Sequence, residues 1–260
     1  LAHALVDERT GPADRSRIAW LEARLAQAQG KMSDALSLAG EAAGHARAAG
    51  ERALVVNALA VQGTLSMRSG RRDEAKAIFE SLLEVGADAE PSQARAHAHT
   101  GLGRLADGQG DHARALHHFQ ACLDDVEALG SPRALAGAWL NLGIELRVAE
   151  HPAQAMSHVE EARVLSHDMG LRGTEARASL ELGAIQLMLG RLGTGADLLQ
   201  DGYELARAVG DHEIALLARR RLAGLLVDLY FGLCIGQFNN FLRLFQYGEF
   251  FRVTGVDGAG

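Results

Sequence analysis

The residue types that bind metals are present, but their spacing argues against a metal site. The chain has eleven histidines. His97 and His99 stand two residues apart, so on a helix they cannot share a face. No cysteine or carboxylate stands at metal-ligand spacing from His112 or from the consecutive residues His117 and His118. We therefore expect exposed or half-packed histidines, no bound metal and no cofactor.

Patterns typical of catalysis are also missing. The segment GLGRLADG at 101–108 has the glycines of a phosphate loop but neither its Lys-Ser/Thr ending nor a preceding strand. No Ser-His-Asp or Cys-His grouping can be assembled from the sequence. Carboxylates such as Asp124–Asp125 and Glu160–Glu161 are expected on solvated helix faces. The sequence predicts that the protein is not an enzyme.

Composition narrows the class of protein further. The net charge of −7 argues against a general nucleic-acid binder. Two cysteines are too few for a disulfide framework, so a reducing cytoplasm is expected. The apolar stretch Leu222–Phe238 is interrupted by Asp228 and is too short for a membrane span. A composition rich in Ala, Arg and Gly, with Lys31 and Lys76 as the only lysines, is typical of a GC-rich bacterial genome.

Small residues recur every forty positions. The column through Gly143 holds only Ala or Gly, namely Ala23, Gly63, Gly103, Gly143, Gly183 and Ala223. Seven residues later stand Gly30, Gly70, Gly110, Glu150 and Gly190, and five beyond these stand Ala35, Ala75, Ala115, Ala155 and Gly195. A further column holds Gly50, Glu90, Gly130, Gly170 and Gly210. Columns in phase over this length predict a repeat protein, a solenoid of stacked units.

The glycine column has a physical reason. Glycine inside a helix costs about 1 kcal/mol relative to alanine, so close approach of a second helix must offset the loss. A larger side chain at Gly103 or Gly143 should overpack this contact by about 1–3 kcal/mol. Five residues before the column stand Ile18, Ala58, Ala98, Ala138, Ala178 and Ala218, and two residues after it stand Leu25, Leu65, Leu105, Ile185 and Leu225. Together they predict an apolar helical stripe with a shallow notch.

Caps and breakers divide the repeats into helix pairs. Helices are expected over 12–29, 31–49, 51–69, 71–85, 172–189 and 191–209. Further helices should open at Glu90–Pro91, after Asp111, at Ser131–Pro132, at His151–Pro152 and after Asp211. A last helix is expected over 232–246, where Gly248 would end it.

These motifs resemble the tetratricopeptide repeat (TPR). Its pattern W-x2-LG, then Gly, then Ala is best matched by Trp139, Leu142, Gly143, Glu150 and Ala155. The forty-residue period is similar to the subclass of the Pins/LGN polarity proteins, kinesin light chains and bacterial maltose-regulator-type sensors. The turn segments 49–56 and 208–215 are also similar to turns of that subclass. The resemblance implies an all-α fold: a right-handed α-solenoid of about six antiparallel helix pairs with a concave inner face.

The repeat frame gives the expected domain organisation. Residues 1–10 would be the end of a preceding repeat, which suggests a piece of a longer array. The TPR array would cover 11–230, with repeats near 11–50, 51–90, 91–130, 131–170, 171–210 and 211–246. Residues 231–260, rich in Phe, would form a capping helix and a flexible tail. Alternatives for residues 231–251 are a surface for homodimerisation or partner binding, or a membrane anchor.

The resemblance also implies a binding surface. In TPR domains, the first helix of each pair lines the groove. Carried onto this sequence, the lining consists of Arg17, Trp20, Arg24, Asn57, Thr64, Arg68, His97, Arg104, Asn141, Arg147, Arg177, Arg220 and Arg221. Asn141 matches an asparagine that bonds a peptide main chain in the family. The Lys-Asn carboxylate clamp of chaperone-binding members is not reproduced.

The positive charge expected along the groove suggests its ligand. Because arginine suits carboxylates and a concave wall focuses its field, an acidic peptide segment of a protein partner is expected. Arginines that are simply solvated are the alternative interpretation. Two functions remain open: a protein-binding scaffold or regulatory domain, and a ligand- or peptide-sensing domain of a larger bacterial regulator or kinase.

Overall fold

The computed structural model describes residues 10–86 and 92–234, with no account of the side chains of 228–234. These residues form α-helices joined by short turns, with no strand in the described ranges, which confirms the predicted all-α class. The helices are α1 (Pro12–Ala28), α2 (Met32–Ala49), α3 (Arg52–Arg68), α4 (Arg72–Gly86), α5 (Gln93–Asp107), α6 (His112–Leu129), α7 (Pro132–Val148), α8 (Pro152–Asp168), α9 (Arg172–Met188), α10 (Leu192–Ala208) and α11 (His212–Cys234).

Helix ends follow the glycine columns. Gly110, just after α5, has φ +76°, and the next residue, Asp111, donates its backbone N–H to the Ala106 carbonyl at 3.0 Å. This backbone turn ends a helix and satisfies a carbonyl that the helix leaves unpaired. The same left-handed turn occurs at Gly30, Gly70 and Gly190, and also at Glu150, the only non-glycine residue with positive φ in the described ranges.

Helix starts were largely predictable. Asp111 and Asp211 cap α6 and α11, each accepting from the backbone N–H three residues on, at 3.0 Å. Pro132 and Pro152 open α7 and α8 as expected. The start predicted at Glu90–Pro91 is slightly early, because the Ser92 hydroxyl caps α5, which begins at Gln93.

The predicted start of a new helix at Gly232 is wrong. α11 runs unbroken to Cys234, since no proline occurs within it and neither Asp228 nor Gly232 ends the helix. The rest of that predicted helix and the tail after it lie outside the described residues, as do residues 1–9 and Glu90. Within the described ranges, no helix is long and apolar enough to cross a membrane.

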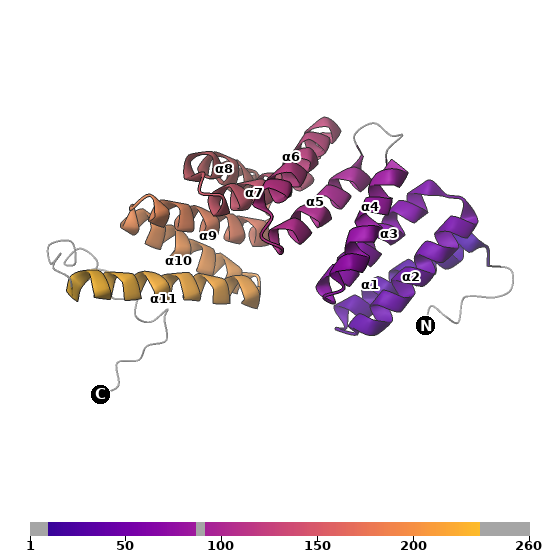
Figure 1. Cartoon of the computed structure of the whole chain (residues 1–260). Helices are drawn as coiled ribbons and strands as arrows, with labels where there is room; N and C mark the ends of the chain where they lie inside the picture. The colour runs from indigo at the N-terminus through magenta and orange to yellow at the C-terminus, as the bar shows by residue number, and fades with distance from the viewer. Residues whose placement is uncertain (1–9, 87–91, 235–260) are drawn as a thin grey trace. The chain divides into compact units, whose positions relative to one another are not determined.

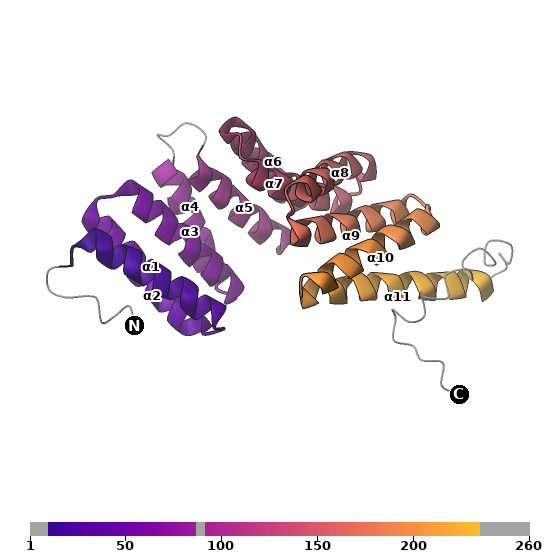
Figure 2. The same cartoon turned by 180° about the vertical axis from the view of Figure 1, so that it is seen from behind.

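The chain divides into two compact units, Leu1–Ser131 and Pro132–Gly260, which are described separately. Unit 1 holds the pairs α1–α2, α3–α4 and α5–α6, and unit 2 holds α7–α8, α9–α10 and α11 (Figures 1 and 2). Short turns make the helices of a pair antiparallel neighbours. Within each unit, successive first helices contact one another more than successive second helices do. We call the first helices (α1, α3, α5 and α7, α9, α11) the inner layer of their unit.

Each notch of the glycine column receives a side chain from the second helix of the same pair. A Cβ on Gly103 would lie 2.7 Å from Cε1 of Phe119, and one on Gly183 would lie 2.8 Å from Cγ of Leu199. These glycines therefore face a neighbouring helix, as predicted. The inserted side chains form a forty-residue column that the sequence analysis overlooked: Ala39, Phe79, Phe119, Val159 and Leu199, all buried.

The apolar residues two positions after the glycine column are buried, as predicted, except for the first of them, Leu25. Leu65 is fully buried because it packs on Ala23 and Ala26 of the preceding pair. Leu25 is 59% exposed, since no described helix precedes α1 to cover it. Burial at this column thus depends on the preceding pair.

Candidate functional site

Positive charge is concentrated on the inner layers. In unit 1 the first helices carry seven arginines and three acidic residues, whereas the second helices carry four basic and nine acidic residues. In unit 2 the first helices carry seven arginines and five acidic residues, and α8 and α10 carry two arginines and six acidic residues. A chain of net charge −7 therefore has a net positive inner layer in each unit.

In unit 1, the predicted residues Arg17 and Arg24 contact other side chains of the protein. Arg17 forms exposed ion pairs with Asp14 at 2.9 Å and Glu51 at 3.4 Å. The Arg24 guanidinium lies over the Trp20 ring, 5.1 Å from its centre. The Trp20 indole N–H is buried and has no hydrogen-bond partner among the described residues. The ring and the cation thus stack on one another within one turn of α1.

The other predicted residues of unit 1 are spread over α3 and α5. Asn57, Arg68, His97 and Arg104 are exposed, and the Thr64 hydroxyl donates to the Ala60 carbonyl of its own helix. Asn57 also lines a recess of about 250 Å³ between the N-terminal ends of α3 and α5; its other lining residues are Arg52, Ala53, Val56, Ser92, Gln93 and Ala94. The structure thus places these residues on one layer without joining them into a single pocket.

In unit 2, two predicted arginines converge on a carboxylate that the sequence analysis did not nominate. Arg147 on α7 and Arg221 on α11 each donate to Glu181 on α9, at 2.9 Å. Arg221 also donates to the Leu180 carbonyl at 2.8 Å. These two arginines are therefore not simply solvated, which had been the alternative interpretation.

The remaining members in unit 2 have no such partner. Asn141 and Arg177 are half-buried and Arg220 is exposed, and none of the three makes a side-chain hydrogen bond or ion pair among the described residues. A signal for Glu181 did exist in the sequence. Asn141, Glu181 and Arg221 occupy one column at intervals of forty, so the repeat frame alone places them on adjacent first helices.

The expectation that carboxylates are solvated holds only in part. Asp124, Glu160 and Glu161 are exposed, but Asp125 is buried and forms an ion pair with Arg95 at 3.3 Å. Asp125 is buried because its side of α6 packs on α5. Burial raises the pKa of the Asp125 carboxyl, and Arg95 opposes this rise.

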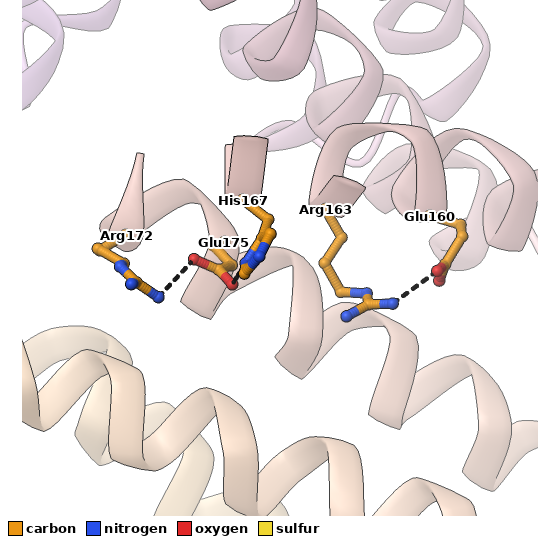
Figure 3. A network of polar contacts seen from close by, with 5 residues as sticks. All are labelled: Glu160, Arg163, His167, Arg172 and Glu175. Atoms are coloured by element: carbon orange, nitrogen blue, oxygen red, sulfur yellow. Dashed lines mark hydrogen bonds and ion pairs between the residues drawn. The ribbon is translucent and has the colours of Figure 1, made fainter. Parts of the chain in front are cut away.

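Another buried carboxylate, that of Glu175, belongs to a polar network on α8 and α9. Figure 3 shows Glu175 between His167 and Arg172, with Arg163 directed toward Glu160. Oε1 of Glu175 lies 2.8 Å from Nδ1 of His167, and its Oε2 lies 3.4 Å from Nη1 of Arg172. Glu175 is buried, whereas His167 and Arg172 are exposed. The network joins the end of α8 to the start of α9 and fixes the turn between these two pairs.

Two histidines of unit 1 come together across α5 and α6. Nδ1 of His99 lies 3.1 Å from Nδ1 of His118, and both side chains are half-buried. Burial, with like charges nearby, lowers the pKa of both imidazoles. The sequence analysis missed this pair because it compared histidines within one helix. Nearby, burial raises the pKa of the Cys122 thiol, so the nucleophilic thiolate is disfavoured.

Comparison with solved structures identifies the fold. A Rap protein complexed with Competence and Sporulation Factor matches with a TM-score of 0.67 and 13% identity, over 96% of this chain and 77% of that one. BtubC (BKLC) from P. vanneervenii matches at 0.66 and 20%, over 81% and 87%. A STAND protein of Pyrococcus horikoshii with a tetratricopeptide repeat sensor matches at 0.66 and 13%, over 78% of this chain and 31% of that one. The fold is that of the TPR proteins. No protein-family model and no curated protein matches the sequence.

The TPR motif residues prove to be packing residues. Leu142, Gly143 and Ala155 are buried, and Trp139 is half-buried. Glu150 is the left-handed residue of the α7–α8 turn. The motif thus specifies the TPR fold.

Proposed function

We propose that this TPR protein is a protein-interaction module whose inner layers bind an acidic peptide segment of a partner. The observation that carries the proposal is the separation of charge between first and second helices. A positive layer attracts an acidic segment at long range, and guanidinium groups then bind its carboxylates. Structures of this fold include a Rap protein complexed with a factor, which supports a binding role.

Arginines without an acidic partner are the preferred contacts. Arg68 in unit 1 and Arg177 in unit 2 make no ion pair among the described residues. A ligand can therefore pair with them without first breaking a contact inside the protein. Asn57, which is exposed, and Asn141, which is half-buried, lie on the same layers and can form hydrogen bonds with the peptide main chain.

The test is binding of labelled peptides of equal length that are acidic, neutral or basic, measured by fluorescence anisotropy. We expect the acidic peptide to bind at about 50 mM salt and to lose most of its affinity at about 500 mM, because salt screens exposed charges. Arg68→Gln and Arg177→Gln should each weaken binding about threefold to tenfold, equivalent to about 0.7–1.4 kcal/mol.

The matched control is Arg47→Gln. Arg47 is exposed on α2, a second helix, so this variant changes the net charge equally on the opposite layer and should bind normally. Equal binding of the neutral or basic peptide, or affinity that does not depend on salt, would contradict the proposal.

A second function, a sensor domain of a larger regulator, is favoured by the similarity to the STAND protein, whose tetratricopeptide repeats are described as a sensor. This chain spans less than a third of that protein. The gene sequence around the region encoding this chain distinguishes the two: a DNA-binding or nucleotide-binding domain in the same reading frame supports the sensor, and its absence from the full gene supports the interaction module.

A further inference from the structure

Glu181 lies on the inner layer of unit 2 between arginines from both neighbouring first helices. Its side chain is about 4% exposed. Nε of Arg147 on α7 donates to Oε2 at 2.9 Å, and Nη2 of Arg221 on α11 donates to Oε1 at 2.9 Å. Each carboxylate oxygen is thus bound by a different helix, and one buried acid links three successive repeats.

The two arginines keep most of their donors available. A guanidinium has five N–H donors. In the described residues Arg147 uses one of them, and Arg221 uses two, one for Glu181 and one for the Leu180 carbonyl. Both side chains are about 20% exposed, so their outer edges reach solvent.

The cluster is positive despite its buried acid. Two arginines and one glutamate leave a net charge of +1, and Arg177 raises it to +2. Arg177 stands one turn before Glu181 on α9, so the two side chains share a face of the helix. Two guanidinium groups bound to one carboxylate, with a third arginine one turn away that makes no ion pair within the described residues, are an arrangement suited to binding a further carboxylate.

We propose that Arg147, Arg177 and Arg221 form a carboxylate-binding site for an acidic side chain of the partner, and that Glu181 is its internal competitor. This inference rests on the proposed function and locates the anchor point in unit 2. The negative charge of Glu181 reduces the attraction for a second carboxylate, and its hydrogen bonds occupy donors that the ligand needs. Glu181 therefore sets the affinity of the site.

Neutralising Glu181 tests the inference. Glu181→Gln removes the charge while keeping the shape of the side chain. The probe is a fluorescein-labelled oligoglutamate peptide, titrated with the full chain at low and high salt. We expect the variant to bind at least about tenfold more tightly than the original protein, since one repulsive charge next to the site is removed.

The matched control is Glu175→Gln. Glu175 is also a buried, ion-paired acid of α9, but its partners are His167 and Arg172. This variant makes the same chemical change on the same helix and should leave the affinity unchanged. Adding Arg177→Gln to the Glu181→Gln variant should abolish the gain.

The outcomes separate the inference from the proposed function. If the original protein binds oligoglutamate and Glu181→Gln binds no better while melting normally, Glu181 is only structural and the inference is overturned. If only the variant binds, the inference stands and the acidic preference of the original protein fails. Should Glu181→Gln not fold, Arg177→Gln in the original chain must weaken binding at least about fivefold without changing the melting temperature, and unchanged affinity would overturn the inference.

Discussion

At the scale of single residues, the fold depends on paired sizes at two columns. Gly103 opposes Phe119, and Gly183 opposes Leu199. In the first helix pair both positions are alanine. Ala23 stands where the later pairs have glycine, and the side chain opposite it, Ala39, is correspondingly small. Wherever glycine occurs at the first column, the space left by its missing side chain is filled by a larger side chain from the second, as dense packing requires. Glycine at this column is thus explained by its partner.

Gly103→Ala should lower the free energy of unfolding by about 1–2 kcal/mol, because the new methyl group overlaps the Phe119 ring. Phe119→Val alone should also destabilise, by about 2 kcal/mol, since it leaves a cavity. The double variant should be more stable than the sum of the two predicts, by about 1 kcal/mol or more in a double-mutant cycle measured by urea unfolding.

The control for this cycle is Gly44→Ala in α2. Gly44 lies in a helix of the same unit, and a Cβ there meets nothing within 4 Å. Alanine at this position should raise stability by about 0.5–1 kcal/mol through helix propensity alone. Strictly additive effects of the Gly103 and Phe119 substitutions would rule out the proposed fit.

Glu150 has φ +62°, in a turn where the other repeats have glycine. A residue with a Cβ is strained there by about 1–2 kcal/mol, partly offset by the greater freedom of glycine in the unfolded chain. Glu150→Gly should therefore stabilise the protein by about 0.5–1 kcal/mol, measured by urea unfolding. The reverse change, Gly190→Glu at the equivalent turn, should destabilise it by a similar amount, and a loss of stability in Glu150→Gly would contradict this account.

At the scale of helices, α5 and α6 are joined by the His99–His118 contact. A single hydrogen bond between two Nδ1 atoms requires that at least one imidazole be neutral. The pKa of each is lowered by burial and by neighbouring charge. The unfolded chain, whose histidines titrate near pH 6.5, therefore binds protons that the folded pair refuses.

We accordingly expect stability to fall as the pH drops below about 6.5 toward the lower pKa values of the folded protein. His118→Gln should reduce this fall, because one imidazole of the pair, with its lowered pKa, is removed and glutamine can still accept a hydrogen bond from His99. The check is urea unfolding between about pH 5 and pH 8, with His45→Gln of α2 as the control. A pH profile that is unchanged in His118→Gln would show that the pair is not responsible.

At the scale of the whole molecule, the forty-residue period predicted the helices, their turns and the notch. It succeeded because backbone constraints, such as a left-handed turn or a close helix contact, restrict a position to glycine or alanine. Contacts between particular side chains were harder to predict from the sequence. The forty-residue frame places Glu181 and Arg221, which have opposite charges, on adjacent first helices, but the contact itself depends on how the two helices pack. Asp125 was misplaced for the same reason, since burial of a charge depends on the neighbouring helix.

The fit between notch and inserted side chain has an evolutionary consequence. Phe119 and Gly103, or Leu199 and Gly183, belong to the same helix pair, so each hairpin carries both halves of its own joint. Duplication or deletion of a forty-codon segment therefore adds or removes the glycine and its inserted side chain together. A later mutation of one of these two residues can be compensated by a mutation of the other. Such a gene can lengthen or shorten its product in whole hairpins while selection acts separately on the charged side chains that meet other molecules.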